Sequence, residues 1–217
     1  MGNCVIFCAG GFDGLIVPVQ ADDFLLAADG GLTHLQKLNL TPNGILGDFD
    51  SLGYVPDKGI VFPVEKDDTD SMLAVRQGLK LGYRSFLLYG GLDGPRLDHT
   101  IANFQTLQFL ANHGAQGYLI GAEYIATVIK NGSLTFPAEA AGILSVFCMG
   151  TDARGVTLKG LQYTLDNAVL TAGMPLGVSN HFIGSEAVVC VEDGSLLLLY
   201  DRSNGLPVVK RQEGKAC

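Results

Sequence analysis

The chain has 217 residues and a formal net charge of −8 at pH 7, from 14 Lys and Arg against 22 Asp and Glu. This acidity excludes a protein that binds nucleic acid by neutralising phosphates, and a hydrophobic content of 47% excludes extensive disorder. The acidity is concentrated between residues 48 and 70, which contain seven acidic residues and two lysines. Such a cluster of carboxylates is either a solvated loop or a site for a cation.

The first part of the chain alternates short apolar runs with helical patterns. Buried strands that run into turns or loops are predicted at residues 4–8, 24–28, 44–47, 60–64, 85–89 and 118–120. Helices are predicted after Gly31, after Asp68 or Thr69 as a candidate N-cap, and from about His99. This order predicts an N-terminal α/β domain over residues 1–122, with a mostly parallel sheet flanked by helices. Ligands of such sheets lie outside the carboxyl ends of the strands.

The character of the sequence changes at residue 123. Strand-like runs alternate with glycine turns, and no long helical periodicity appears. Residues 123–217 are therefore predicted to form an antiparallel β-sandwich or roll.

The sequence also predicts the compartment. No run approaches the roughly 18 apolar residues that a membrane span needs, and the start has no basic segment followed by a long apolar stretch. The five cysteines are scattered and mostly lie in apolar runs, so we expect buried thiols. Together these features predict a cytoplasmic protein that does not contact membranes.

Two acidic motifs follow predicted strands of the α/β domain. Asp48 and Asp50 are two residues apart, so in an extended backbone their side chains point to the same side. Two hard oxygen ligands presented together suit Mg²⁺, which proteins hold through one or two carboxylates plus phosphate oxygens and water. Asp70 begins a predicted helix, where it either complements the helix dipole or completes the metal shell beside Thr69.

A third polar loop follows the strand at 85–89. Arg96 lies in a glycine-rich segment, where a planar cation suits binding of phosphate, and Asp98 is placed either to cap a helix or to act on a ligand. The sequence contains no P-loop, dinucleotide-binding or nucleophile-elbow motif. The residues alone thus predict a Mg²⁺-dependent enzyme that acts on a phosphorylated ligand.

The ordered motifs resemble those of the thiamin pyrophosphokinase family. In the first half they are Ala28-Asp29-Gly30-Gly31, Gly47-Asp48-Phe49-Asp50-Ser51, Lys66-Asp67-Asp68-Thr69-Asp70 and Arg96-Leu97-Asp98-His99-Thr100 with Asn103. In the second half they are residues 155–163 and Gly177-Val178-Ser179-Asn180. The resemblance covers nearly the whole chain and implies an ATP- and Mg²⁺-binding catalytic domain, a thiamin-binding domain and a homodimer with active sites at the interface.

The resemblance also implies the reaction and its residues. The thiamin hydroxyl would attack the β-phosphorus of ATP, giving thiamin diphosphate and AMP. By motif, the catalytic residues are Asp98, Arg96 and Asp70; the Mg²⁺ ligands are Asp48, Asp50 and Asp70; the ATP-binding residues are Asp29, Gly30, Asp68, Thr69, Arg96 and Asn103; and the thiamin-binding residues are Ser179, Asn180 and Phe182. Asp98 either accepts a hydrogen bond from the attacking hydroxyl or helps to bind metal.

The sequence departs from the family pattern at three places. Leu32-Thr33-His34 stands where relatives often have Ala-Asn-Arg, and His181 stands where many carry an acid. The chain has no Trp, so an aromatic side chain against thiamin must be Phe or Tyr, and Phe182 is a candidate. Two alternatives stay open: a different Mg²⁺-dependent nucleotide enzyme, such as a transferase that uses Asp-x-Asp, and a non-catalytic thiamin or nucleotide sensor.

Overall fold

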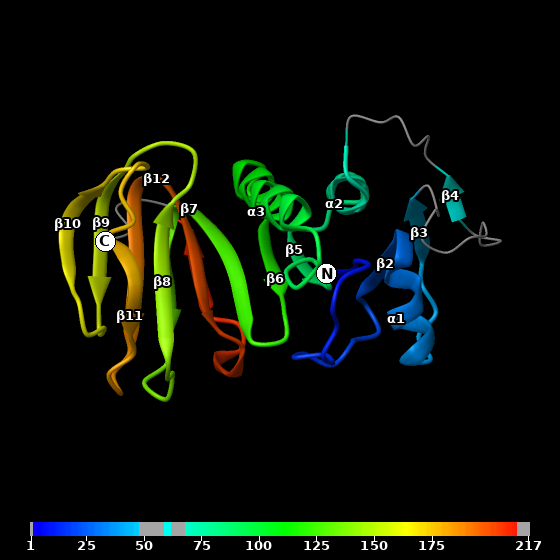
Figure 1. Cartoon of the computed structure of the whole chain (residues 1–217), viewed down its shortest axis with the longest axis horizontal. Helices are drawn as coiled ribbons and strands as arrows, with labels where there is room; N and C mark the ends of the chain where they lie inside the picture. Colours follow the sequence, from blue (N-terminus) through cyan, green and yellow to red (C-terminus); the bar gives the residue numbers. More distant parts are fainter. Residues whose placement is uncertain (1, 48–58, 62–67, 212–217) are drawn as a thin grey trace. The chain divides into compact units, whose positions relative to one another are not determined.

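The chain divides into two compact units, Met1–Ala122 and Glu123–Cys217, each described here by itself (Figure 1). The computed structural model describes residues 2–47, 59–61 and 68–211. None of the helices in these ranges is long and apolar enough to cross a membrane.

The first unit is built on a parallel sheet. Its strands are β1 (Cys4–Phe7), β2 (Phe24–Ala28), β3 (Gly44–Gly47), β4 (Gly59–Val61), β5 (Ser85–Tyr89) and β6 (Gln116–Ile120). They lie in the order β6-β5-β1-β2-β3-β4, and every neighbouring pair is parallel. The central strands are apolar and buried along almost their whole length, as expected of a sheet covered on both faces.

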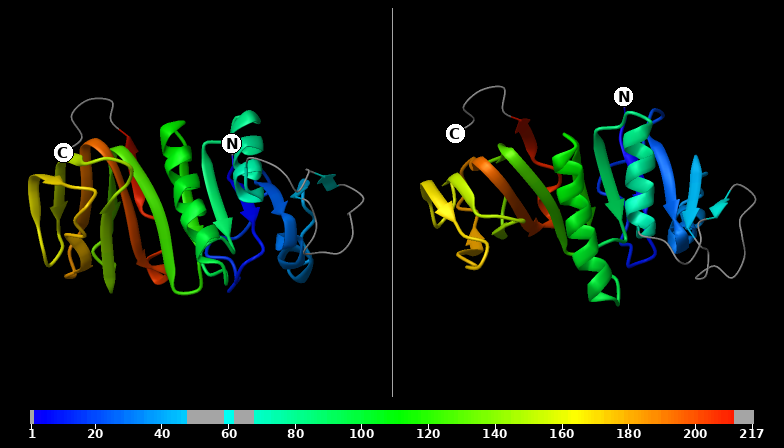
Figure 2. Two further views of the ribbon diagram at one scale, coloured as in Figure 1. Left: turned by 45° about the horizontal axis from the view of Figure 1, so that its top comes forward. Right: turned by 90° about the horizontal axis from the view of Figure 1, so that it is seen from above.

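Helices connect these strands. They are the 3₁₀ turn η1 (Asp29–Gly31), α1 (Leu32–Lys37), α2 (Asp70–Lys80) and α3 (Leu97–Asn112). Helix α2 packs against β1, β2 and β3, whereas α3 packs against β6 (Figure 2). Gly78 in α2 and Gly117 in β6 permit these close approaches, because a Cβ at either position would collide with side chains of the opposing element.

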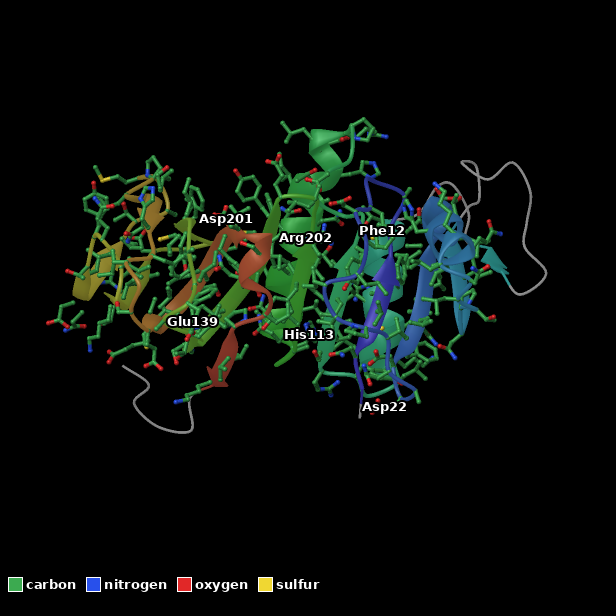
Figure 3. The ribbon with its side chains drawn as sticks, turned by 90° about the horizontal axis from the view of Figure 1, so that it is seen from below. Phe12, Asp22, His113, Glu139, Asp201 and Arg202 are labelled. Carbon is green, nitrogen blue, oxygen red and sulfur yellow. The ribbon has the colours of Figure 1, made fainter. Side chains whose placement is uncertain are left out.

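The second unit is an antiparallel β structure. Its elements are β7 (Tyr124–Phe136), β8 (Ile143–Cys148), β9 (Ala153–Lys159), β10 (Leu165–Leu170), β11 (Gly177–His181), β12 (Ala187–Asp201), the turn η2 (Arg202–Asn204) and β13 (Val208–Arg211). The long strands β7 and β12 form its centre, and β12 also pairs with β8 and β9. At the end of β12, Asp201, which is labelled in Figure 3, accepts a hydrogen bond from the Ile143 backbone N–H at 3.0 Å.

The predicted fold class is confirmed: a mostly parallel sheet with flanking helices precedes an antiparallel β domain. Two local expectations need correction. Helix α3 begins at Leu97, two residues before the predicted start, so Asp98 lies within its first turn. Cys190 is disulfide-bonded, so the expectation of five thiols is wrong at that position, whereas Cys4, Cys8 and Cys148 are free.

Candidate active site

A cavity of about 400 Å³ opens at the carboxyl ends of β1, β2 and β5 in the first unit. Its wall is formed by the loops that follow these three strands and by the N-terminal turns of α2 and α3. The lining residues are Cys8, Ala9, Gly10, Ala28, Asp29, Thr69, Asp70, Ser71, Gly90, Gly91, Gly94, Pro95, Arg96, His99, Thr100 and Asn103. The predicted position of the site, outside the carboxyl ends of parallel strands, is therefore where the structure has its cavity.

The N-terminal turn of α2 contributes two of the predicted residues. Thr69 is the N-cap, and its side-chain oxygen accepts a hydrogen bond from the Met72 backbone N–H at 3.3 Å. Asp70 is the first residue of the helix and lines the cavity. Burial, and to a lesser extent the negative charge of Asp70, raises the pKa of the Cys8 thiol to about 12. Cys8 is thus a neutral, buried part of the wall.

Asp29 places a second carboxylate on the same cavity. It follows β2 directly and has a φ of 48°, a left-handed conformation that is uncommon for a residue other than glycine. Such conformations are retained where the surrounding structure fixes them, often at functional sites. Gly30 follows within η1 but does not line the cavity in the described residues.

Arg96 and Asp98 form an exposed ion pair at the start of α3. Arg96 donates from Nε to Asp98 Oδ1 at 3.2 Å and from Nη2 to Oδ2 at 2.5 Å, with side chains 67% and 61% exposed. This hydrogen bonding holds the pKa of Asp98 below its usual value and raises that of Arg96. Both groups are therefore charged at neutral pH. Arg96 lines the cavity, whereas Asp98 lies beside it and does not contribute to the wall.

Two predicted ATP-binding residues have partners within the protein. Asp68 accepts hydrogen bonds from Arg76, the closer from Nε at 2.7 Å, and does not line the cavity. Asn103 lines the cavity but is 7% exposed, and its side chain bonds to Ser71 and to the Gly91 carbonyl. The structure thus brings Asp29, Thr69, Asp70, Arg96 and Asn103 to one cavity and leaves Gly30, Asp68 and Asp98 outside its wall.

The predicted metal ligands Asp48 and Asp50 lie outside the described residues. Within residues 2–47, 59–61 and 68–211, no group of three His, Cys, Asp or Glu side chains is placed to hold a metal ion. Asp29 and Asp70 supply carboxylates to the cavity, and such hard oxygen donors are of the type that Mg²⁺ prefers. The described part of the site is therefore chemically compatible with Mg²⁺.

Sequence reasoning missed the residues that hold the cavity wall in place. The His34 Nε2 atom lies 2.9 Å from the Gly10 carbonyl oxygen, and since a carbonyl only accepts, this nitrogen carries the proton. The His34 ring also packs on Phe12, and Phe12 contacts Phe7 and Tyr89. Phe12 is labelled in Figure 3. The only sequence signal was the departure from the family pattern at residues 32–34.

In the second unit, the predicted thiamin-binding residues Ser179 and Asn180 differ in exposure. Ser179 is exposed, has a φ of 58°, and donates its backbone N–H to Ser145 Oγ at 3.0 Å. Asn180 is 3% exposed, and its side chain accepts from the Tyr163 N–H at 2.9 Å and donates to the Tyr163 carbonyl at 2.7 Å. Asn180 therefore fixes the backbone of Tyr163.

The aromatic residues of this region are placed differently from one another. Phe182 is half-buried and packs against the buried Phe136, with ring centroids 5.1 Å apart. Tyr163, which sequence reasoning did not single out, is 62% exposed while its backbone is clamped by Asn180. Tyr163 thus presents an aromatic face to solvent, whereas Phe182 contributes to the interior of its own unit.

Comparisons with known proteins agree with this architecture. Residues 18–119 match the family described as "Thiamin pyrophosphokinase, catalytic domain", and residues 133–197 match "Thiamin pyrophosphokinase, vitamin B1 binding domain". A protein of Bacillus subtilis (strain 168) named thiamine pyrophosphokinase is 26% identical over 183 residues, covering 80% of this chain and 85% of the relative.

Solved structures show the same fold. The structure of thiamine pyrophosphokinase from Bacillus subtilis aligns with a TM-score of 0.80 at 22% identity, covering 92% of this chain and 99% of that one. A thiamin pyrophosphokinase family protein from Enterococcus faecalis aligns with a TM-score of 0.77 at 25% identity, covering 92% and 99% of the two chains.

Proposed function

The chain belongs to the thiamin pyrophosphokinase family, and from this premise we propose that it transfers the diphosphoryl group of ATP to the thiamin hydroxyl, releasing AMP. The observation that carries the proposal is the cavity at the ends of three parallel strands, which gathers Asp29, Asp70 and Arg96 within the region that matches the catalytic domain. Two carboxylates and one guanidinium suit a polyphosphate with its cation.

The ATP phosphates are proposed to lie against the first turn of α2 and the glycine loops. Helix α2 has 11 residues, and its N-terminal backbone N–H groups carry a partial positive charge that favours anions. Gly90, Gly91 and Gly94 also line the cavity, and the absence of side chains there lets phosphate oxygens approach the backbone. The predicted roles of Asp29, Thr69, Arg96 and Asn103 toward ATP belong to this proposal, whereas Gly30 and Asp68 lie outside the cavity wall.

Magnesium is proposed as the cofactor, held by Asp70 together with Asp48 and Asp50. The support is the carboxylate chemistry of the cavity wall, where Asp29 and Asp70 would otherwise oppose an anionic substrate. When bound, Mg²⁺ would neutralise part of the phosphate charge and help to fix the orientation of the polyphosphate.

The protein's own contribution to the reaction is positioning and electrostatics. The thiamin hydroxyl oxygen forms a bond to the β-phosphorus, the bond from that phosphorus to the AMP oxygen breaks, and the hydroxyl proton is released to water. Asp98 is proposed to accept the hydrogen bond of that hydroxyl, and its low pKa keeps it ionised and able to accept. Arg96 is proposed to stabilise charge on the transferred group, which requires it to exchange part of its pairing with Asp98 for phosphate.

Thiamin is proposed to contact the second unit through Ser179 and the clamped Tyr163. The support is that Tyr163 is exposed while Asn180 holds its backbone, so an aromatic face is available at little entropic cost. Asn180 then acts on thiamin through Tyr163, and the predicted contact from Phe182 is limited by its packing on Phe136.

A homodimer is proposed because several large apolar side chains of the second unit are exposed, including Met174 (64%), Leu176 (59%) and Ile183 (58%). Sedimentation of a fully active monomer at micromolar concentration would contradict it.

A cytoplasmic location is proposed because the reaction needs ATP. The disulfide at Cys190 is more typical of an oxidising compartment. Cell fractionation tests the location, and recovery of the protein outside the cytoplasm would contradict it.

The test is to incubate the protein with ATP, Mg²⁺ and thiamin and to separate the products by chromatography. We expect AMP and thiamin diphosphate to appear together and AMP to be absent when thiamin is omitted. Binding of thiamin without turnover would instead indicate a sensor. Release of a nucleotide only on addition of a nucleotide sugar would indicate a different transferase.

A further inference from the structure

A chain of hydrogen bonds joins three separate segments of the cavity wall through Asn103. Ser71 Oγ donates to Asn103 Oδ1 at 2.6 Å, and Asn103 Nδ2 donates to the Gly91 carbonyl at 2.7 Å. Ser71 lies in the first turn of α2, Asn103 in α3, and Gly91 in the loop after β5. Both side chains are 7% exposed, so neither bond is readily exchanged for water.

The direction of this chain is fixed by chemistry. The Gly91 carbonyl only accepts, so the amide nitrogen of Asn103 must face it and the amide oxygen must face Ser71. The Ser71 hydroxyl proton is therefore committed to Asn103. In the 3.0 Å contact between Thr69 Oγ1 and Ser71 Oγ, Thr69 must then be the donor.

The same logic determines what Thr69 offers to the cavity. Its hydroxyl proton points to Ser71, and one lone pair of its oxygen accepts from the Met72 N–H. Its hydroxyl is thus unable to donate to a phosphate oxygen while the chain is intact. Phosphate must instead be met by backbone N–H groups of the α2 turn and by Arg96.

From this geometry we propose that Asn103 is a positioning residue, which locks the glycine loop after β5 to the first turn of α2 and sets the hydroxyl directions of Ser71 and Thr69. This inference rests on the proposed diphosphoryl transfer and replaces a direct contact between Asn103 and ATP. A second tie joins α3 to the same loop, because Thr100 Oγ1 donates to the Leu92 carbonyl at 3.2 Å. Asn103 differs from Thr100 because it also bonds to Ser71 of α2 and so sets the directions of the Ser71 and Thr69 hydroxyl groups.

Asn103→Asp and Asn103→Ala separate positioning from a general structural role. An ionised aspartate cannot donate to Gly91, so kcat should fall about 10- to 100-fold at pH 7.5 with the KM for thiamin unchanged. A protonated aspartate regains one donor, so the ratio of Asn103→Asp to wild type should rise as the pH is lowered toward 5. The ratio for Asn103→Ala should stay flat. Each ratio is taken at one pH because wild type and variants share the other charged and polar groups of the cavity, including Asp29, Asp70, Arg96 and His99.

The matched control is Asn112→Asp, which makes the same chemical change at an exposed position of the same helix. It should keep wild-type kinetics at every pH. Wild-type kcat in Asn103→Ala, or an identical pH profile for Asn103→Asp and Asn103→Ala, would overturn the inference. If Asn103→Asp does not fold, Ser71→Ala is used in its place. The double variant Ser71→Ala with Asn103→Ala should then lose no more activity than Asn103→Ala alone. Fully additive losses would contradict a chain that acts as a unit.

Hydrogen exchange keeps this inference separate from the proposed function. Backbone amides of residues 69–72 and 90–94 should exchange faster in Asn103→Ala than in wild type or Asn112→Asp, whatever reaction the protein catalyses. If exchange is faster in Asn103→Ala but the wild-type protein forms no thiamin diphosphate, the proposed function is refuted and the positioning role of Asn103 stands. Unchanged exchange in an active protein would refute the tie.

Discussion

Substitution of Gly90 by alanine should destabilise the first unit more than the same change at Gly14. Both glycines have left-handed backbones, with φ of 71° and 81°. An added Cβ at Gly90 would lie 2.6 Å from the Cys8 carbonyl oxygen and 3.1 Å from that of Gly10, whereas at Gly14 nothing lies within 4 Å. Both variants incur about 1–2 kcal/mol of backbone strain. Gly90→Ala adds about 1–3 kcal/mol for the forced shift of the neighbouring loop.

The assay is urea unfolding followed by circular dichroism, with the free energy of unfolding compared between the two variants. Each Gly→Ala change also lowers the conformational entropy of the unfolded chain, and this stabilising effect is the same in both variants, so it cancels when they are compared. Gly90 also accepts a hydrogen bond from the Gly10 N–H at 3.0 Å, and both residues line the cavity, so kcat/KM for ATP should fall only in Gly90→Ala. Equal destabilisation by the two variants, within about 0.5 kcal/mol, would refute the close packing of these loops.

Three further predictions concern charge, titration and aromatic packing. Asp70→Asn should lower kcat about 100-fold, because it removes charge where the cation and phosphates meet; a full-rate enzyme at saturating Mg²⁺ would remove Asp70 from the metal shell. Burial raises the pKa of the Cys4 and Cys8 thiols from 9.0 to about 12, so both stay protonated in the folded chain after they ionise in the unfolded one. Their contribution to stability is complete below pH 9 and is lost as the pH rises toward 12, so the free energy of unfolding should fall over that window, and less steeply in Cys4→Ala. Phe182→Ala should destabilise the second unit by about 2–3 kcal/mol. Tyr163→Ala should change stability by less than about 0.5 kcal/mol and raise the KM for thiamin. A raised KM in Phe182→Ala with a loss of stability in Tyr163→Ala would contradict these roles.

Local patterns in the sequence were enough to predict the elements that place the site. Leucines at helical spacing predicted α1, where Leu35 is fully buried, and Thr69 was one of two predicted caps of α2. Continuous apolar runs predicted the strands that carry Cys8, Asp29 and Gly90 to one edge of the sheet. These features depend on residues that are close in sequence, which is why they can be read without a structure.

The missed features depend on contacts between distant residues. Asn103 joins partners 12 and 32 residues away, and no local pattern distinguishes such an amide from one that binds a ligand. Phe182 was predicted to pack on thiamin because the chain has no Trp for that role, but its packing on Phe136 is set by the sheet of the second unit. Burial and hydrogen-bond direction depend on tertiary packing. Only the structure could therefore separate the predicted site residues that face the cavity from those that support its wall.

The central claim is transfer of a diphosphoryl group, and a product analysis by phosphorus NMR tests it most directly. With ATP, Mg²⁺ and thiamin present, equal amounts of AMP and thiamin diphosphate should accumulate, with no AMP formed when thiamin is left out. Formation of ADP and thiamin monophosphate, or release of AMP that does not depend on thiamin, would contradict the account.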